Sequence, residues 1–138
     1  MQLSENYRAF EKMTMIVVIN SQRARFIKAE GRDLNEVNEL ERGERENEGR
    51  PGLGPNAGPL DEDAQEKEDV KRFFKEVAEY LQKKLPADVE NLIIAVPDFH
   101  MNLLEENLHP DTKAKILEMV NKNLASLEVS AIAKIILE

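Results

Sequence analysis

Runs of apolar residues alternate with polar segments along this chain, and their spacing predicts an ordered series of strands and helices. Residues 14–20 are β-branched and apolar on both faces, which is typical of a central strand covered on both sides. Residues 23–29 have a mixed pattern, as expected for a second strand nearer the edge of a sheet. Residues 34–41 fit either a helical spacing or an extended chain. We favour a third, edge strand there, because it follows two hairpin-like strands.

The strongest periodic signal predicts a long helix in the middle of the chain. Its apolar residues recur at intervals of three and four from Val70 to Leu85, which is the spacing of one helical face. Asp63 is placed to cap the N-terminus of this helix, with Glu66 at the position that completes a capping box. Pro86 ends it. At about 1.5 Å per residue, such a helix extends for roughly 33 Å.

Shorter elements follow in the second half of the chain. Residues 92–96 predict a second buried strand, and a short helix is expected from Asp98. Pro110 suits the first position of another helix, and residues 127–137 predict a closing helix. Residues 116–122 fit either an extension of a helix or a strand. The order of elements predicts an α/β fold, with a mixed β-sheet flanked by helices.

The length of the chain indicates a single domain. Its 138 residues are enough for a sizeable core. We expect this domain to span residues 14–138, after an N-terminal extension at residues 1–13. In the extension Leu3, Tyr7 and Phe10 have a helical spacing. The extension therefore either docks as a short helical turn or frays.

Residues 43–63 form the least regular segment. They hold five of the 6 glycines and three of the 6 prolines of the chain. Only Leu53, Ala57 and Leu60 are apolar, so burial cannot offset the entropy cost of ordering the segment. We expect a long flexible loop, and loops of this length inside a domain are commonly functional or disordered.

Composition and charge narrow the classes of function. The net charge of -8 repels polyphosphate at long range, which argues against broad non-specific binding to nucleic acid. The chain has no cysteine, which excludes disulfides, thiolate metal sites and a cysteine nucleophile. Its apolar runs are too short to cross a bilayer, and its first residues do not resemble an export signal. We therefore expect a cytoplasmic protein without a membrane partner.

The glycine-rich segment does not match a nucleotide-binding loop. Gly52, Gly54 and Gly58 are interspersed with prolines, which lack the backbone N–H groups that cradle a phosphate. The segment also lacks the Gly-Lys-Ser/Thr sequence that leads into a helix in phosphate-binding loops. We do not expect it to bind a nucleotide.

The remaining candidates for chemistry have simpler explanations. We interpret His100 as a partly exposed helix residue and His109 as part of a helix N-cap region, since a histidine and a neighbouring carboxylate do not make a metal site. The acidic residues lie in loops and on helix surfaces, whereas two-metal catalysis needs carboxylates that converge on strand ends. We expect no metal site, no cofactor and a non-enzymatic protein.

Arg23 and Arg25 point to the same face of the predicted second strand. They either bind an acidic group or a phosphate, or pair with nearby glutamates. Those glutamates are Glu36, Glu39 and Glu41.

Several short segments, in their order along residues 14–137, resemble the bacterial host-attachment protein family, whose members are described as required for attachment to host cells. The segments are VVINSQRARF at 17–26, GRPG at 49–52, IIAVP at 93–97, LHP at 108–110 and VNKNL at 120–124. Each is short and degenerate, so the resemblance rests on their order. It implies that residues 116–122 form a strand.

The host-attachment family is similar in turn to the middle domain of archaeal and eukaryotic class-1 peptide-chain release factors. That domain has an α/β fold of the ribonuclease H-like or ribosomal-protein-like kind. In the release factors, the loop before the long helix carries Gly-Gly-Gln and reaches the peptidyl-transferase centre. Residues 43–63 occupy the matching place here but lack Gly-Gly-Gln. The resemblance therefore does not imply peptide release.

What the resemblance implies is a non-enzymatic binding domain that contacts the ribosome or an RNA-associated protein. The candidate contact residues are Arg23, Arg25, Gly49, Arg50, Gly52, Gly54, Asn56 and Gly58. The alternative is a protein-interaction module, with another protein as partner and an indirect role in attachment. A third hypothesis is a ribonuclease H-like, metal-dependent nuclease.

Overall fold

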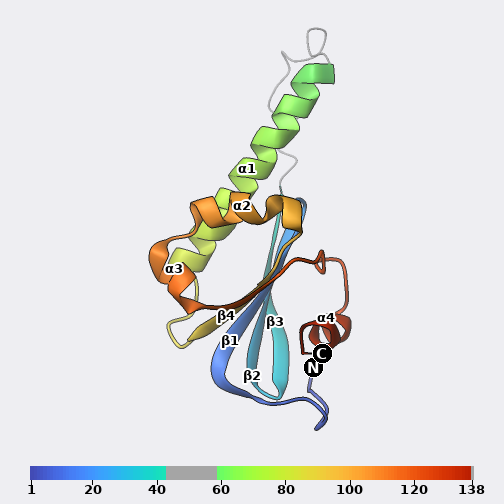
Figure 1. The fold of residues 1–138 in the computed structure, drawn as a ribbon, viewed down its shortest axis with the longest axis vertical. Helices are drawn as coiled ribbons and strands as arrows, with labels where there is room; N and C mark the ends of the chain where they lie inside the picture. Colours follow the sequence, from blue (N-terminus) through green and yellow to red (C-terminus); the bar gives the residue numbers. More distant parts are fainter. Residues whose placement is uncertain (43–58, 138) are drawn as a thin grey trace.

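In the part of the chain that the structure describes, five strands form one sheet and four helices pack around it (Figure 1). The computed structural model describes residues 1–42 and 59–137, without the side chains of residues 59–65. The strands are β1 (Phe10–Ile19), β2 (Arg23–Gly31), β3 (Asp33–Glu41), β4 (Asn91–Ala95) and β5 (Ile116–Val120). The helices are α1 (Pro59–Lys83), α2 (Asp98–Asn107), α3 (Pro110–Lys115) and α4 (Val129–Leu137).

The sheet is mixed. Its strands lie in the order β3-β2-β1-β4-β5, with β1 at the centre. β2 runs antiparallel to both β1 and β3, whereas β4 is parallel to β1, and β5 is parallel to β4. Parallel neighbours need long return connections, and α1 and the α2–α3 pair supply them. The predicted α/β fold, a mixed sheet flanked by helices, is confirmed.

β1 is apolar throughout its second half because both of its faces are covered. Met15, Val17 and Ile19 pack on the side of α1, and Ile16 and Val18 pack on the side of α4; all five are fully buried. Removing each such side chain from water stabilises the fold by about 1.5–3 kcal/mol. The prediction of a central strand covered on both sides is confirmed.

α1 covers one face of the sheet with the apolar stripe predicted from the sequence. Phe73, Phe74, Val77, Ala78 and Leu81 are all buried against β1, β2 and β4. The start of the helix was predicted wrongly, because α1 begins at Pro59 and not after a cap at Asp63. Proline fits the first turn of a helix, where its missing N–H has no intrahelical acceptor to lose.

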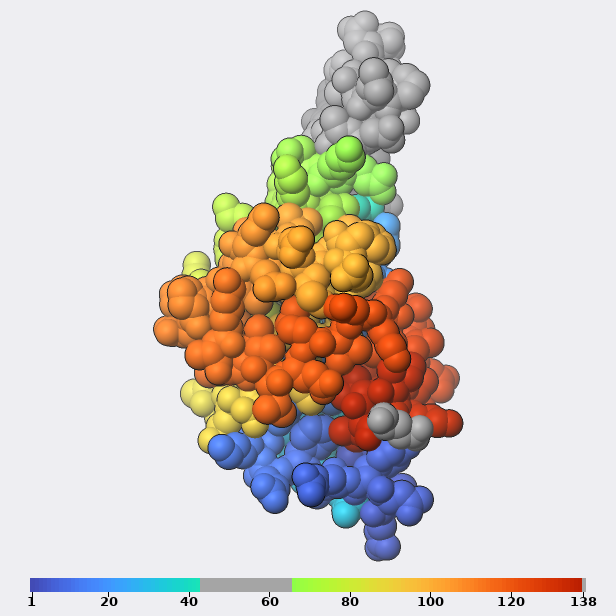
Figure 2. Space-filling model, in the orientation of Figure 1, coloured from blue at the N-terminus to red at the C-terminus, as the bar shows by residue number. Residues whose placement is uncertain are grey.

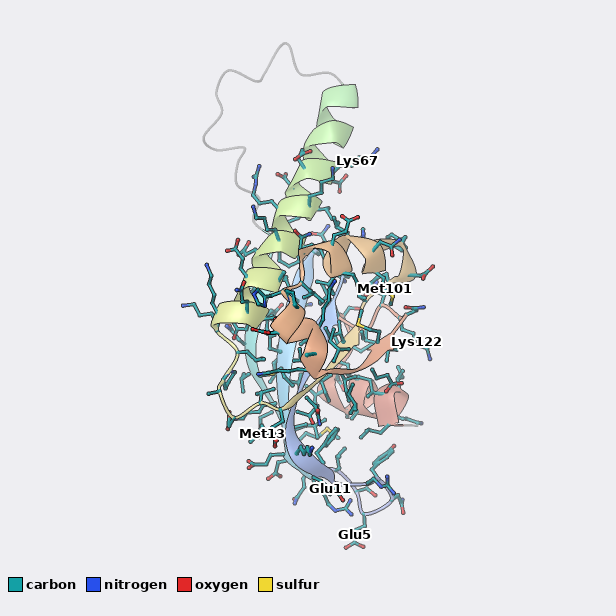
Figure 3. All side chains as sticks on the ribbon, turned by 60° about the vertical axis from the view of Figure 1, so that its left-hand side comes forward. Glu5, Glu11, Met13, Lys67, Met101 and Lys122 are labelled. Atoms are coloured by element: carbon teal, nitrogen blue, oxygen red, sulfur yellow. The ribbon has the colours of Figure 1, made fainter. Side chains whose placement is uncertain are left out.

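The N-terminal turns of α1 project beyond the sheet (Figure 1). Among the α1 side chains that the structure describes, the first that pack on the core are Val70 and Phe73, and about ten helical residues, or roughly 15 Å of helix, precede them. In Figure 3, Lys67 lies on this projecting part, while Glu11 and Met13 lie toward the opposite end of the molecule. Glu66, Lys67 and Glu68 are exposed.

α4, the chain just before it and the N-terminal residues cover the opposite face of the sheet. Ile132 and Ala133 of α4 are buried there with Leu124 and Ala125, which precede the helix. Their partners in the sheet are aliphatic side chains from β1, β2, β3 and β4. The sheet is therefore the middle layer between the α1–α2 side and the α4 side.

The N-terminal residues dock on the edge of the sheet and do not fray, with a single turn in which the Tyr7 N–H donates to the Ser4 carbonyl. β1 begins at Phe10, four residues before the predicted start. Gln2 forms an isolated antiparallel bridge with Asp33, and the N-terminal amino group of Met1 donates to the Leu34 carbonyl at 2.7 Å. Leu3 is buried with the α4-side core.

The C-terminal half follows the sequence-based reading closely. Residues 116–120 form β5, which confirms the strand that the family resemblance implied and periodicity left open. Pro110 occupies the first turn of α3, as predicted. β5 is an edge strand, and the exposed Leu117 lies where the pairing register with β4 shifts.

Candidate interaction surface

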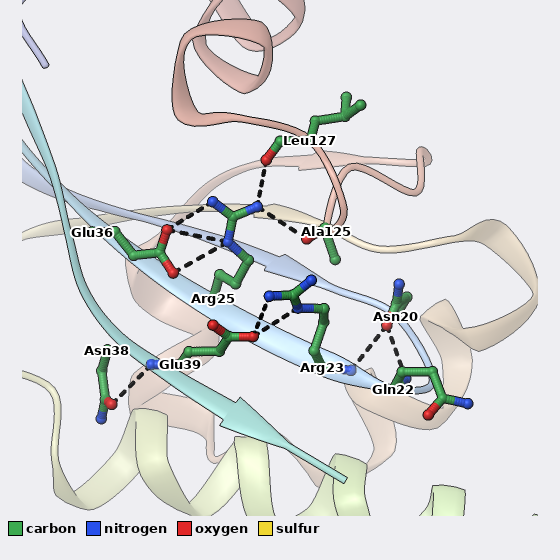
Figure 4. A network of polar contacts seen from close by, with 9 residues as sticks. All are labelled: Asn20, Gln22, Arg23, Arg25, Glu36, Asn38, Glu39, Ala125 and Leu127. Atoms are coloured by element: carbon green, nitrogen blue, oxygen red, sulfur yellow. Dashed lines mark hydrogen bonds and ion pairs between the residues drawn. The ribbon is translucent and has the colours of Figure 1, made fainter.

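Arg23 and Arg25, the predicted pair on β2, both pair with glutamates of β3 (Figure 4). Arg23 Nη2 lies 2.5 Å from Glu39 Oε2, and Arg25 Nη2 lies 2.7 Å from Glu36 Oε1. Of the two alternatives that the sequence left open, the structure shows pairing with nearby glutamates. Phosphate binding by these groups would require the pairs to open.

A β-bulge aligns the two glutamates with the two arginines. Phe26 lies opposite Asn38, and Ile27 lies opposite Glu36, so Val37 is an extra residue in β3. Side chains alternate between faces along a strand, and residues three apart would otherwise point in opposite directions. The inserted Val37 brings Glu36 and Glu39 to the same face. Val37 itself is exposed.

Arg25 ties three elements together. Its side chain is only 9% exposed. Nε and Nη2 donate to the Glu36 carboxylate, while Nη1 donates to the carbonyls of Ala125, at 3.0 Å, and Leu127. The hydrogen bond to Glu36 raises the pKa of the Arg25 guanidinium, which stays charged. All three nitrogens of the group are engaged, so Arg25 fastens the chain before α4 to the sheet.

Arg23 is more accessible than Arg25. Its side chain is 37% exposed, and Nε and Nη2 contact Glu39 from one side only. Its backbone N–H donates to Asn20 Oδ1 at 2.9 Å, which closes the β1–β2 turn together with the N–H of Gln22. Asn20 Nδ2 in turn donates to Asn123 Oδ1 at 3.2 Å. This turn fixes Arg23 at the end of the sheet from which α1 projects.

Arg42 lies at the same end, directly before the segment at residues 43–58. Its backbone N–H donates to the Gln22 carbonyl at 2.8 Å, and Nη2 lies 3.7 Å from Glu66 Oε1 on α1. Its Nη1 is buried without a hydrogen-bond partner in the described part of the chain. Nothing in the sequence singled out Arg42, because its position depends on how β3 ends beside α1.

The other predicted contact residues lie outside the described residues. They are Gly49, Arg50, Gly52, Gly54, Asn56 and Gly58. The expected long loop at residues 43–63 is shortened from its C-terminal side, since residues 59–63 belong to α1. The chain thus leaves the sheet at Arg42 and re-enters the described structure at the far end of the projecting helix.

The two histidines have the roles expected from the sequence. His109 is the N-cap of α3, and its Nδ1 accepts from the backbone N–H of Asp111 at 3.0 Å. His100 is half-buried on α2, with its ring 5.2 Å from that of Phe74 and 4.3 Å from that of Phe99. Burial lowers the pKa of His100.

Neither a metal centre nor a membrane span was found among the residues that the structure describes. No group of three or more His, Asp or Glu side chains in that part of the chain could hold a metal ion. Within the same residues, no helix is both long and apolar enough to cross a membrane.

Solved structures with the same fold include translation factors. The chain is similar to S. cerevisiae Dom34, described as a translation termination-like factor involved in RNA quality control pathways and interacting with Hbs1, with a TM-score of 0.54 and 11% identity over 93% of this chain and 33% of that chain. It is also similar to the archaeal translation termination factor aRF1, with a TM-score of 0.52 and 19% identity over 78% of this chain and 29% of that chain. At these identities the likeness shows a shared fold. The chain spans about a third of the length of these proteins.

The amino-acid sequence matches a known protein family over most of its length. No curated protein sequence matches the chain significantly. Residues 13–136 match the family described as "Bacterial archaeo-eukaryotic release factor family 12", which confirms the release-factor-like part of the predicted resemblance. The host-attachment part of it stays a hypothesis. Because the match covers nearly the whole chain, this protein belongs to bacterial archaeo-eukaryotic release factor family 12.

Proposed function

We propose that this protein is a non-enzymatic binding domain that docks on the bacterial ribosome or on an RNA-associated protein of the translation machinery. The observation that carries the proposal is the projecting N-terminal part of α1 in a member of a release-factor family. Residues 43–58 join the tip of this projection to Arg42 at the sheet. A contact at the projecting turns of α1 lies away from the core, so binding there need not disturb the fold.

The family likeness does not bring peptide release with it. The chain contains no Gly-Gly-Gln, the sequence that the release factors carry in the loop before their long helix. We therefore propose binding without peptidyl-tRNA hydrolysis. Dom34 is described as a factor in RNA quality control that interacts with Hbs1, and a role in translation quality control without hydrolysis fits this chain better than termination.

The contact surface that we propose combines Arg23 with the segment at residues 43–58. That segment contributes Gly49, Arg50, Gly52, Gly54, Asn56 and Gly58. Arg23 is accessible beside Arg42, where the segment begins. Arg25 is buried, so its role in the proposed surface is to stabilise the sheet and not to contact the ribosome or a partner protein. Arg23 and Arg50 can each form charge-assisted hydrogen bonds to a phosphate or carboxylate.

Co-sedimentation with purified bacterial ribosomes at low salt tests the proposal. We expect the wild-type chain to pellet with ribosomes. A variant in which residues 44–57 are replaced by Gly-Ser sequence of equal length should stay in the supernatant. The equal length keeps the number of residues between Arg42 and α1 unchanged, so that only the composition of the segment differs. Lys75→Ala, on the exposed side of the packed part of α1, is the control and should pellet like the wild type.

The proposal fails if the wild-type chain does not pellet at low salt, with or without tRNA. It also fails if the variant with the replaced segment pellets as well as the wild type, because the contact would then lie elsewhere.

A protein-interaction module with an indirect role in attachment is the second candidate function. The net charge of -8 favours it, since an acidic surface suits protein contacts better than contacts with RNA phosphates. A pull-down before and after nuclease treatment distinguishes the two candidates. A protein partner is retained after nuclease treatment and at raised salt, whereas a phosphate-dependent one is lost.

A further inference from the structure

The outward side of α2 combines one exposed aromatic ring with three carboxylates. Phe99 is 81% exposed, more than any other large apolar side chain in the described residues. Helical spacing places four further exposed residues on the same side of the helix, and the buried Leu104 on the other. They are Asp98, Asn102, Glu105 and Glu106. We call these five residues the α2 outer face.

Phe99 is exposed but in ring contact with its neighbour on the helix. Its ring lies 4.3 Å from that of His100, and the His100 ring lies 5.2 Å from that of the buried Phe74. The ring is therefore presented on a row of aromatic contacts that leads into the core. Exposed aromatic side chains of this kind are enriched at the centres of protein interfaces.

The carboxylates of the α2 outer face are unpaired within the described residues. Asp98, Glu105 and Glu106 form no ion pair there, although lysines and arginines elsewhere on the surface do pair with acids. An apolar side chain that is exposed alone needs no explanation. Phe99 is not alone, because unpaired charges of one sign surround it. The surface is complementary to a cationic partner that also carries apolar or planar groups.

The charge of this face distinguishes between the two classes of macromolecule found on a ribosome. Carboxylates repel the phosphates of RNA, so stacking of a base on Phe99 would be opposed by three neighbouring charges. Arginine and lysine side chains would pair with the same carboxylates, and a guanidinium can also lie over the Phe99 ring. The observations favour a protein partner.

We infer that the α2 outer face binds a basic segment of another protein, with Arg or Lys side chains on Asp98, Glu105 and Glu106 and one such side chain, or an aliphatic one, over Phe99. α2 itself lies beside α1, below the projecting turns of that helix (Figure 1 and Figure 2). This inference deepens the proposed function, because it names the class of partner and a second contact surface. It does not depend on residues 43–58.

Binding to two purified probes tests the inference. The immobilised full chain is exposed to RNA-free ribosomal protein and, separately, to protein-free ribosomal RNA, both at about physiological salt. We expect the wild type to retain a subset of the basic proteins, and any RNA that it retains through residues 43–58 to be unaffected by substitution of Phe99. Phe99→Ala should reduce that retention at least tenfold, which is typical of the loss of an interface anchor, while all charges stay in place.

Leu117→Ala is the matched control, because Leu117 is also a large exposed apolar residue, at 64%, but lies on β5. This variant should bind like the wild type. A double charge reversal, Glu105→Lys with Glu106→Lys, should also abolish binding. Both glutamates are exposed, so the variant should fold normally, and circular dichroism checks this.

The inference is overturned if Phe99→Ala retains the proteins as well as the wild type, if Leu117→Ala loses them equally, if RNA is retained by the wild type and lost by Phe99→Ala, or if the wild type retains no protein. The outcome is separate from that of the sedimentation test. Failure of the variant with replaced residues 44–57 to affect ribosome binding would remove the proposed function and leave this surface standing. If instead Phe99→Ala leaves protein binding unchanged while replacement of residues 44–57 abolishes ribosome binding, this surface is rejected and the proposed function stands.

Discussion

The two faces of the sheet are covered in different ways. On the α1 side, large apolar side chains, including Phe73 and Phe74, fill the space between a long helix and the strands. On the α4 side, the core is aliphatic, the helix is only 9 residues long, and the buried Arg25 bonds to the chain before it. The long amphipathic helix is positioned mainly by burial of its apolar stripe, with few polar bonds to the sheet among the described residues. A short one is marginal by itself, and here polar bonds fix the segment that leads into it.

The largest effect is expected from opening the α1 side. Phe74→Ala should lower the free energy of unfolding by about 3–5 kcal/mol, because it leaves a cavity beneath α1 and α2. Urea unfolding followed by circular dichroism measures this. Phe99→Ala is the matched control, since the same substitution at an exposed ring should change stability by less than about 0.5 kcal/mol. Equal losses in the two variants would contradict the packing described here.

A smaller but still substantial effect is expected on the α4 side. Arg25→Met should cost about 2–4 kcal/mol, because it leaves Glu36 and two carbonyls without their donor in a largely buried place. Arg25→Lys should recover only part of this, since one ammonium cannot serve all three acceptors.

Arg23→Met on the same strand is the control for Arg25→Met. The Arg23–Glu39 ion pair is partly exposed to solvent, so Arg23→Met should lower the free energy of unfolding by less than about 1 kcal/mol. If Arg23→Met is as costly as Arg25→Met in the same urea measurement, the α4 side is not fastened as we describe.

The smallest expected effect is a pH dependence of stability that arises on the α1 side of the sheet, at His100. Burial against Phe74 lowers the pKa of His100, so below its ordinary value of 6.5 the unfolded chain binds more protons than the folded one. Stability should therefore fall as the pH decreases from 6.5 through the lowered pKa, and should be unaffected above 6.5. Arg25 on the other face stays protonated over this range.

Comparing wild type with His100→Gln isolates this contribution. The difference in unfolding free energy between the two should change between about pH 7 and pH 5 in favour of the variant as the solution becomes more acidic. Parallel stability curves over that range would show that His100 is not desolvated against Phe74.

Much of the fold could be predicted from the sequence because its signals are local. The apolar run of β1, the stripe of α1 and Pro110 at the start of α3 depend on neighbours along the chain. The boundaries were less certain. Pro59 starts α1 in spite of the capping-box spacing at Asp63, because such spacings also occur by chance inside a helix.

Much less of the candidate surfaces could be predicted. Arg23 and Arg25 were identified, but which glutamate each one binds depends on the bulge at Val37, and that requires the pairing of two strands. The α2 outer face was missed, since the sequence predicted only a short helix from Asp98 and did not single out Phe99. A helical wheel would have placed it beside Asp98 and Glu106, but only packing shows which side of α2 faces the solvent.

The sequence by itself determined the kinds of element, their order and the absence of cysteine chemistry, because propensity, periodicity and composition act over a few neighbouring residues. The tertiary structure decided the rest. It added the N-terminal residues to the edge of β3, extended α1 beyond the sheet, and used the one buried arginine of the described residues to bond Ala125 and Leu127 across about a hundred positions of chain. Contacts so distant in sequence form only when the sheet assembles, and no local pattern records them.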